Sequence, residues 1–268
     1  MRRFNSNIVS AGIFFIVLFA AVQSPAESQL SKAPVNPEFT AWQTKQELLT
    51  SDQDGYPQGY IPSPVDRSHL QSQTQLLLDG LEGPPSSYDL RIQGHVTVVK
   101  DQGTGCGSCW SFATYGSLES WLLKNEWEYR DFSENHLKNH HGFDWGPCDG
   151  GNSDVSTAYL ARWSGPVDES DDPYHNLDDY PSPGGACQKY VKKVLYFFTE
   201  TDIKNALMTH GAMFVTMRME PGSYNAPDYT YYYNGSEDID HAVTLVGWND
   251  NKFVTGAPAN GAWLVKNS

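Results

Sequence analysis

The chain has 268 residues, enough for one large domain or two small ones. Apolar residues make up 39% and charged residues 19%, a composition that predicts a chain folded over most of its length. The formal charge of −14, from 18 Lys and Arg against 32 Asp and Glu, argues against a nucleic-acid partner or an anionic membrane surface.

The first 26 residues are predicted to be a signal peptide. Arg2 and Arg3 precede an apolar run at 8–22, which is shorter than the roughly 20 residues that a membrane span needs. Small residues at Ser24 and Ala26 suit cleavage near Ala26. Export would place the protein outside the cell or in the cell envelope, where disulfides are permitted. A retained membrane anchor is the alternative interpretation.

Residues 27–84 are predicted to be a leader or pro-segment. They are polar and rich in Gln, Ser, Pro and Asp, with little helical or strand periodicity. One short helix is expected in "SHLQSQTQLLLDGL" at 68–81. Denser apolar patterning begins after the Gly-Pro-Pro break at 83–85, so a folded domain is predicted over 85–268.

The predicted elements of this domain change from helical to β-rich along the chain. The first half is predicted to contain a strand at 95–100, a glycine-rich turn at 101–108, a helix beginning at Cys109 and a short helix at 153–163. The second half is predicted to contain a strand at 190–198, a helix at 199–210 capped by Gly211, and strands at 212–219, 231–234, 241–248 and 261–266. This order predicts an α+β domain with two lobes.

Cys109 and His241 are the candidate nucleophile and base. A thiol attacks a carbonyl as the thiolate, and a free Cys with a pKa near 8.5 supplies little thiolate at neutral pH. A helix N-terminus stabilises the anion, and a nearby His accepts the proton. Because Cys109 opens the predicted helix and His241 begins a strand in the other half, a cleft between two lobes would join them. We therefore expect the pKa of Cys109 to lie well below that of a free thiol.

Two further residues supply what this chemistry requires. Asn267 is the candidate for fixing the tautomer and direction of the His241 imidazole through its side-chain carbonyl. The side-chain amide of Gln102 and the backbone N–H of Cys109 are the candidate donors to an oxyanion.

These residues lie in segments that resemble the papain-like cysteine peptidases. "VKDQGTGCGSCWSFA" at 99–113 is similar to the nucleophile segment of that family, and "PSSYDLRIQGHVTVVK", "FSENHL", "GPCDGG" and "IDHAVTLVGW" follow the family's order around it. His241 lies 132 residues after Cys109 (241 − 109), and Asn267 lies 158 after it (267 − 109). As a whole, the chain resembles bacterial or archaeal secreted members of this family.

The resemblance implies a papain-like fold, with a helical lobe, a β-barrel-like lobe and the active-site cleft between them. It implies a secreted endopeptidase that hydrolyses protein and peptide substrates through a thioester at Cys109, without cofactor or metal. It also implies that the pro-segment can inhibit this endopeptidase within the same chain. It also implies that Gly150 and Gly151 bind substrate backbone, and that Ile239 helps line the pocket for the second residue before the cut.

The cysteines leave several interpretations open. By resemblance Cys106 pairs with Cys148 in a disulfide, which leaves Cys187 without an obvious partner. Cys106 and Cys109 also form the C-x-x-C of a redox pair, and Cys106, Cys109 and Cys148 with a His would form a zinc site. A transglutaminase-like transferase would need an acidic partner at the position of Asn267.

Two of the departures from the family pattern bear on the predicted site and on the predicted β lobe. One extra residue between Gln102 and Cys106 bears on the placement of Gln102. The family continues beyond the position of Ser268 with Trp-Gly and further strands, so we expect a β lobe lacking its C-terminal strands. A catalytically impaired peptide-binding relative or truncated pseudoenzyme is therefore the alternative function.

Three histidines in the loop-rich stretch after the helix that begins at Cys109 are interpreted as solvated loop residues: His136, His140 and His141.

Overall fold

A computed structural model describes residues 59–70, 83–177 and 180–268. The predicted signal peptide, residues 27–58 of the predicted pro-segment and most of the helix expected at 68–81 lie outside the described residues. The helices are α3 (Cys109–Asn125), α4 (Glu134–Asn139), α5 (Ser153–Ala161) and α6 (Glu200–His210), with short 3-10 turns at Ser68–Leu70 and Pro221–Ser223. No helix in the described ranges has the length and apolar character needed to cross a membrane.

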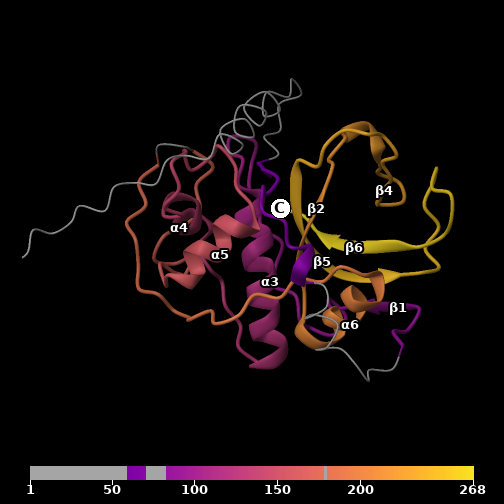
Figure 1. The fold of residues 1–268 in the computed structure, drawn as a ribbon, viewed down its shortest axis with the longest axis horizontal. Helices are drawn as coiled ribbons and strands as arrows, with labels where there is room; N and C mark the ends of the chain where they lie inside the picture. The colour runs from indigo at the N-terminus through magenta and orange to yellow at the C-terminus, as the bar shows by residue number, and fades with distance from the viewer. Residues whose placement is uncertain (1–58, 71–82, 178–179) are drawn as a thin grey trace, which may run out of the picture. The chain divides into compact units, whose positions relative to one another are not determined.

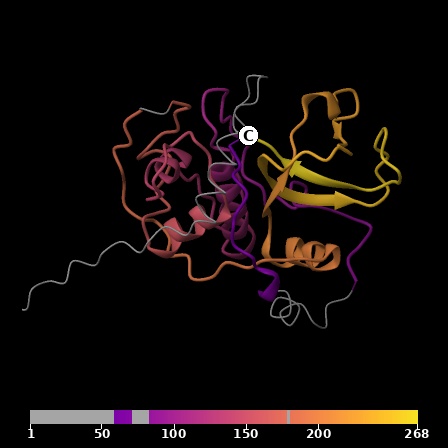
Figure 2. The same cartoon turned by 45° about the horizontal axis from the view of Figure 1, so that its top comes forward.

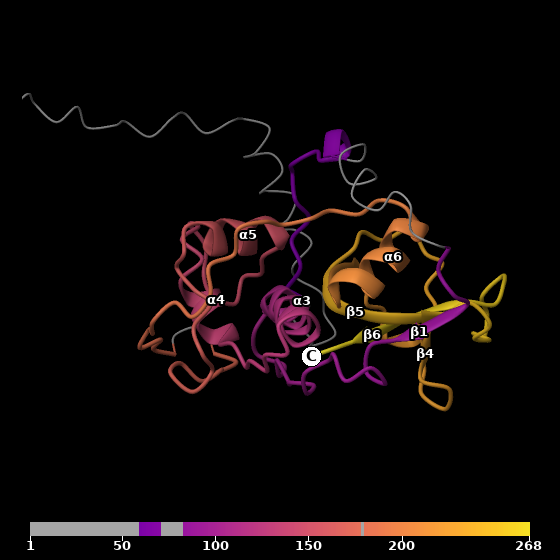
Figure 3. The same ribbon diagram turned by 90° about the horizontal axis from the view of Figure 1, so that it is seen from below.

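Helix α3 is the central element of residues 59–268. Helices α4 and α5 pack on one side of it, and strands β2 (Met213–Met217) and β5 (His241–Asn249) pack on the other (Figure 1; Figure 3). Side chains from most turns of α3 are buried, from Cys109 to Leu122, as expected for a helix covered on more than one face. The predicted change from helices to strands along the chain is confirmed.

Strand β5 is the centre of a four-stranded antiparallel sheet. Its N-terminal part pairs with β2 and its C-terminal part with β1 (Ser87–Asp89), while β6 (Ala262–Lys266) pairs along the opposite edge. Eight of its nine residues are buried, which accounts for its nearly continuous apolar sequence. The described strands form an open sheet rather than a closed barrel (Figure 2). A separate two-stranded ribbon joins β3 (Tyr224–Asn225) to β4 (Thr230–Tyr231).

The helices predicted within residues 85–268 agree with the structure. Helix α3 begins at Cys109 and α5 covers most of the range predicted at 153–163. The Thr199 side chain accepts a hydrogen bond from the backbone N–H of Asp202, which caps α6 at its N-terminus. Gly211 follows the helix with a φ of 105°, a value that favours glycine.

Two predicted strands are wrong, and of the strand predicted at 231–234 only Tyr231 lies in a strand, β4. Residues 190–198 form no strand, and neither do residues 95–100. Side chains hold the second segment instead: Thr97 donates to Glu119 at 2.6 Å, and Lys100 donates to Glu134 at 3.0 Å. Val98 and Val99 are 62% and 70% exposed, so their β propensity has no neighbouring strand or core to act on.

Gly116 sets how closely α3 approaches the sheet. A Cβ at this position would lie 2.2 Å from the Oγ1 of Thr244 in β5, closer than any unstrained contact. The missing side chain therefore lets the helix and the central strand touch, and this contact aligns the first turn of α3 with the first residues of β5.

Gly116→Ala is expected to destabilise the protein by about 1–3 kcal/mol, because the added methyl overpacks against Thr244. Alanine's better helix propensity, worth up to about 1 kcal/mol, opposes this loss. Urea unfolding of the full chain measures the difference. Gly222→Ala is the matched control, since nothing lies within 4 Å of its added methyl. Thr244→Ala in the Gly116→Ala background should recover part of the loss, and an unchanged midpoint for Gly116→Ala would contradict this account of the packing.

Candidate active site

Cys109 lies where α3 meets the beginning of β5. Its side chain is fully buried, and the backbone N–H of Ala242 donates to its Sγ at 3.4 Å. Ser108, at the N-cap, does not cap the helix with its side chain; its hydroxyl is 2.7 Å from that of Tyr174. Because His241 immediately precedes Ala242, the predicted nucleophile and base are neighbours in the structure.

His241 is held by Asn267. The Nε2 of His241 donates to the Oδ1 of Asn267 at 2.7 Å, and the imidazole is buried. A proton fixed on Nε2 leaves Nδ1 as the unprotonated nitrogen of the neutral ring. Among the described residues, no nitrogen or oxygen atom forms a hydrogen bond with Nδ1. The ring therefore presents a base nitrogen in the region of the thiol.

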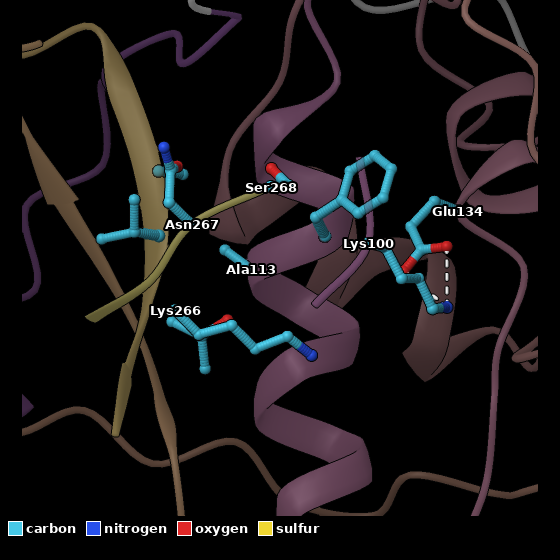
Figure 4. A pocket seen from close by; sticks show the side chains of 10 residues that line it. Lys100, Ala113, Glu134, Lys266, Asn267 and Ser268 are labelled. Atoms are coloured by element: carbon cyan, nitrogen blue, oxygen red, sulfur yellow. Dashed lines mark hydrogen bonds and ion pairs between the residues drawn. The ribbon is translucent and has the colours of Figure 1, made fainter. Parts of the chain in front are cut away.

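Asn267 reaches His241 because β6 pairs with β5 as far as Lys266, which lies opposite Thr244. The chain then passes beside α3, where Phe112, Ala113, Val243 and residues 266–268 line a small cavity (Figure 4). Ser268 continues this contact by donating to the side-chain oxygen of Gln102 at 3.0 Å.

Gln102 lies in the turn before Cys109 despite the extra residue in that turn. Its side-chain N–H donates to the carbonyl of Cys106 at 3.4 Å, and its own backbone carbonyl accepts from the Tyr174 hydroxyl at 2.8 Å. The amide is buried close to the first turn of α3. The structure thus brings Gln102, Cys109, His241 and Asn267 together.

A disulfide joins Cys106 to Cys148, the pairing that the resemblance implied. Neither Cys109 nor Cys187 takes part in a disulfide. A Cys106–Cys109 redox pair is therefore absent, and the zinc site that required the Cys106 and Cys148 thiolates is absent as well. The disulfide also ties the turn before α3 to the loop that carries Gly150 and Gly151.

Three residues of the predicted pro-segment, 59–61, pair with the backbone of Gly151 and Asp240, and Tyr60 packs against the buried cluster that contains Cys109. Gly151 donates its N–H to the carbonyl of Gly59, and Ile61 donates its N–H to the carbonyl of Gly151, each at 2.9 Å. Tyr60 forms a parallel bridge to Gly151 and donates its N–H to the carbonyl of Asp240, also at 2.9 Å. Gly151 and Asp240 thus offer backbone donors and acceptors to an extended chain.

Glycines make this close approach possible. A Cβ on Gly151 would lie 2.5 Å from the indole of Trp110, and one on Gly59 would lie 2.2 Å from the backbone of Gly107. Gly150 has a φ of 106°, which other residues rarely adopt. Ile239 is 40% exposed and belongs to neither buried hydrophobic cluster, so its role in a binding pocket stays a prediction.

Burial raises the pKa of Cys109 to about 12, and the N–H groups of Ala242 and Trp110 lower it only in part. This is the reverse of the expected shift. Loss of hydration moves the pKa of a buried group by up to about 3–5 units, whereas a helix N-terminus contributes about 0.3–1 kcal/mol. The thiol is therefore neutral at neutral pH in this structure.

Two features were missed in the sequence. The segment at 59–61 has no periodicity, and nothing in its composition indicates that it pairs with Gly151 and Asp240. The solvated-loop interpretation is wrong for His136 and His141, which are buried, and His136 belongs to α4. The i, i+4 spacing of His136 and His140 was the available signal that these two rings share a helix face.

Known proteins are similar to this chain in sequence and in fold. Residues 84–268 match the family model of the papain family cysteine proteases. The cathepsin L-like peptidase of Aedes aegypti is 34% identical over 193 residues, which cover 69% of this chain and 55% of that protein. The cathepsin L-like proteinase of Fasciola hepatica is 32% identical over 197 residues, covering 69% and 56%. The chain spans just over half the length of these two relatives.

Among solved structures, the cysteine protease and lectin-like domains of Cwp84, a surface layer associated protein of Clostridium difficile, match with a TM-score of 0.68 and 26% identity, over 84% of this chain and 52% of that chain. A Cwp84 structure determined after propeptide cleavage matches with a TM-score of 0.62 and 30% identity, over 69% and 50%. The papain-like α+β fold is thus confirmed, and the chain belongs to the papain family of cysteine proteases.

Proposed function

We propose that this chain is the latent precursor of a cysteine endopeptidase in which Cys109 is the nucleophile and His241 the general base and acid. The observation that carries the proposal is that the side chains of Cys109, His241 and Asn267 are held next to one another. Asn267 holds Nε2 of His241 at 2.7 Å, and the residue after His241 donates to the Sγ of Cys109. This is the arrangement that activates a thiol for attack on a carbonyl.

The reaction follows from these positions. Nδ1 of His241 takes the thiol proton, and the sulfur of Cys109 bonds to the carbonyl carbon of the peptide. The side-chain N–H of Gln102 and the backbone N–H of Cys109 donate to the oxyanion. The imidazolium then protonates the leaving amine as the C–N bond breaks, which leaves a thioester. Water, deprotonated by His241, attacks the thioester and releases the acid and the free thiol.

The substrate is an extended polypeptide. In an empty groove, the N–H and C=O of Gly151 and the carbonyl of Asp240 would pair with backbone rather than with particular side chains, as they do with residues 59–61. Residues 59–61 would therefore inhibit by occupying the same groove. The bridge between Tyr60 and Gly151 is parallel, so the backbone of residues 59–61 runs in the same direction as the backbone around Gly151.

Further contacts fasten this inhibitory segment to α5. Asn152 donates to the carbonyl of Ile61 at 2.9 Å, and Asp154 accepts from Ser63 and pairs with Arg67. The Arg67 guanidinium also lies 4.8 Å from the ring centre of Tyr196. Release of the peptidase therefore requires breaking both the groove contacts and the Asp154 contacts.

Export completes the proposal. The predicted signal peptide would direct the precursor outside the cell or to the cell envelope, and the relative Cwp84 is named as surface layer associated. The Cys106–Cys148 disulfide suits such an oxidising location.

Asn267→Ala is expected to lower kcat/KM of the released enzyme by roughly 10- to 100-fold, or about 1.4–2.7 kcal/mol, because the imidazole loses the acceptor that fixes its tautomer. A fluorogenic peptide assay measures the change. Asn251→Ala, an exposed Asn in the same half of the chain, is the control. Equal activity in all three proteins would remove Asn267 from the mechanism.

Gly59→Ala is expected to relieve the inhibition in the full chain. The added Cβ collides with the backbone of Gly107, and a φ of 79° strains any non-glycine residue, so the segment leaves the groove. Labelling of Cys109 by a peptidyl electrophile should accelerate about tenfold or more, the factor set by roughly 1.4 kcal/mol of strain.

Gly94→Ala is the matched control for this variant. Its φ of 73° imposes the same backbone strain, but nothing lies within 4 Å of the added methyl. Labelling that is equally fast in the wild type, Gly59→Ala and Gly94→Ala proteins would show that residues 59–61 do not block the groove.

The raised pKa of Cys109 has its own pH signature. A pKa of about 12 keeps the thiol protonated, so alkylation by iodoacetamide in the full chain should rise with each pH unit up to about pH 9 without a plateau. Gly59→Ala should add a plateau at neutral pH, because a rehydrated thiol can form an ion pair with His241. Mass spectrometry of the alkylated peptides follows Cys109, with Cys187 as an internal reference. A plateau already present in the wild-type chain would contradict the burial effect.

A further inference from the structure

A cluster of metal-ligating side chains lies outside the catalytic groups. His136, in α4, and His140, which caps its C-terminus, stack with ring centres 4.2 Å apart. Asp172 comes from the loop that follows α5. One ligand atom from each of these three residues lies within 4.8 Å of the other two. An i, i+4 pair of histidines with a carboxylate is a recurrent donor set for transition metals.

Neighbouring groups orient two of the three side chains. Nδ1 of His136 is 2.6 Å from the hydroxyl of Tyr159, so Nε2 is the ring nitrogen that remains to bind a metal. The Oδ1 of Asp172 accepts from the side chain of Asn135 at 2.7 Å, and its backbone carbonyl accepts from the Ser133 hydroxyl. Such hydrogen bonds to the far side of each ligand are typical of metal sites.

Within the described ranges, no Lys or Arg side chain balances the charge of Asp172. Asp172 is 0% exposed, and within the described ranges it forms no ion pair with Lys or Arg. Its side-chain partners are the neutral groups of Asn135 and Ser182. Arg162 approaches His140 but donates to its backbone carbonyl. A buried carboxylate with only neutral partners is costly, and a divalent cation would supply the missing positive charge.

Ser182 marks where such a cation would lie. Its hydroxyl is 2.9 Å from Nε2 of His140 and donates to Oδ2 of Asp172, so one small polar group bridges two of the three ligands. A metal ion in this position would displace the hydroxyl or take it as a fourth ligand.

We propose that His136, His140 and Asp172 bind a divalent transition metal, with Zn²⁺ the best match to two imidazoles and one carboxylate in a four-coordinate site. The metal would clamp the C-terminal end of α4 to the segment that joins α5 to α6. No helix or strand lies between Arg162 and Thr199 among the described residues, so the ion would act as a cross-link there. The site is independent of the proposed peptidase activity.

The test uses the full chain carrying Cys109→Ala, which removes a competing thiol and prevents self-cleavage. Zn²⁺ is titrated in competition with a chromophoric chelator, and one equivalent should bind. His140→Ala, at an exposed position where folding is spared, and Asp172→Asn should each weaken Zn²⁺ at least about tenfold. His69→Ala, another exposed histidine, should leave the affinity unchanged.

Two further readouts identify the ligands. Co²⁺ bound to the same protein should show visible d–d bands without a thiolate charge-transfer band, because no Cys participates. Zn²⁺ should raise the melting temperature of Cys109→Ala but not that of its His140→Ala derivative. Absence of a one-equivalent site, equal affinity in the His140→Ala protein, or a thiolate band from Cys187 would each overturn the proposal.

Discussion

The contact between α3 and β5 is the constraint on which the rest of the structure depends. Gly116 has no side chain where it meets Thr244, so the helix can lie directly against the central strand. This contact places the Sγ of Cys109 next to the N–H of Ala242, although 132 residues separate Cys109 from His241 (241 − 109). A small shift of the helix along the strand would misalign thiol and imidazole while leaving each lobe intact.

Buried charges hold other segments against the same helix. The Lys100 ammonium contacts the carboxylate of Glu134 at 3.0 Å (Figure 4). It also contacts the carboxylate of Asp131 at 2.5 Å, and that of Glu119 lies 3.6 Å away. Burial lowers the pKa of Lys100, but these carboxylates outweigh it and raise the pKa overall. Breaking one partner of such a cluster leaves an uncompensated buried charge, costing about 3–5 kcal/mol, so the cluster specifies one arrangement of the segment before α3.

In the proposed precursor, latency and chemistry make opposite demands on Cys109. Residues 59–61 pair with the backbone of Gly151 and Asp240, and burial of the Cys109 thiol keeps it protonated. Catalysis requires the thiolate, which needs water or a substrate carbonyl beside it together with the imidazolium of His241. Under the proposed function, removal of residues 59–61 would free the backbone of Gly151 and Asp240 for substrate and rehydrate the thiol, which would lower its pKa.

The sequence by itself determined the fold class and the catalytic candidates. The C-G-S-C-W segment, the His241 strand and the Asn267 position are local patterns in a fixed order, and a helix beginning at Cys109 follows from its own periodicity. Only the tertiary structure decided which way the thiol pKa moves, because desolvation depends on what covers the side chain. It also decided that 95–100 is not a strand, since side chains of the helical lobe bind that segment.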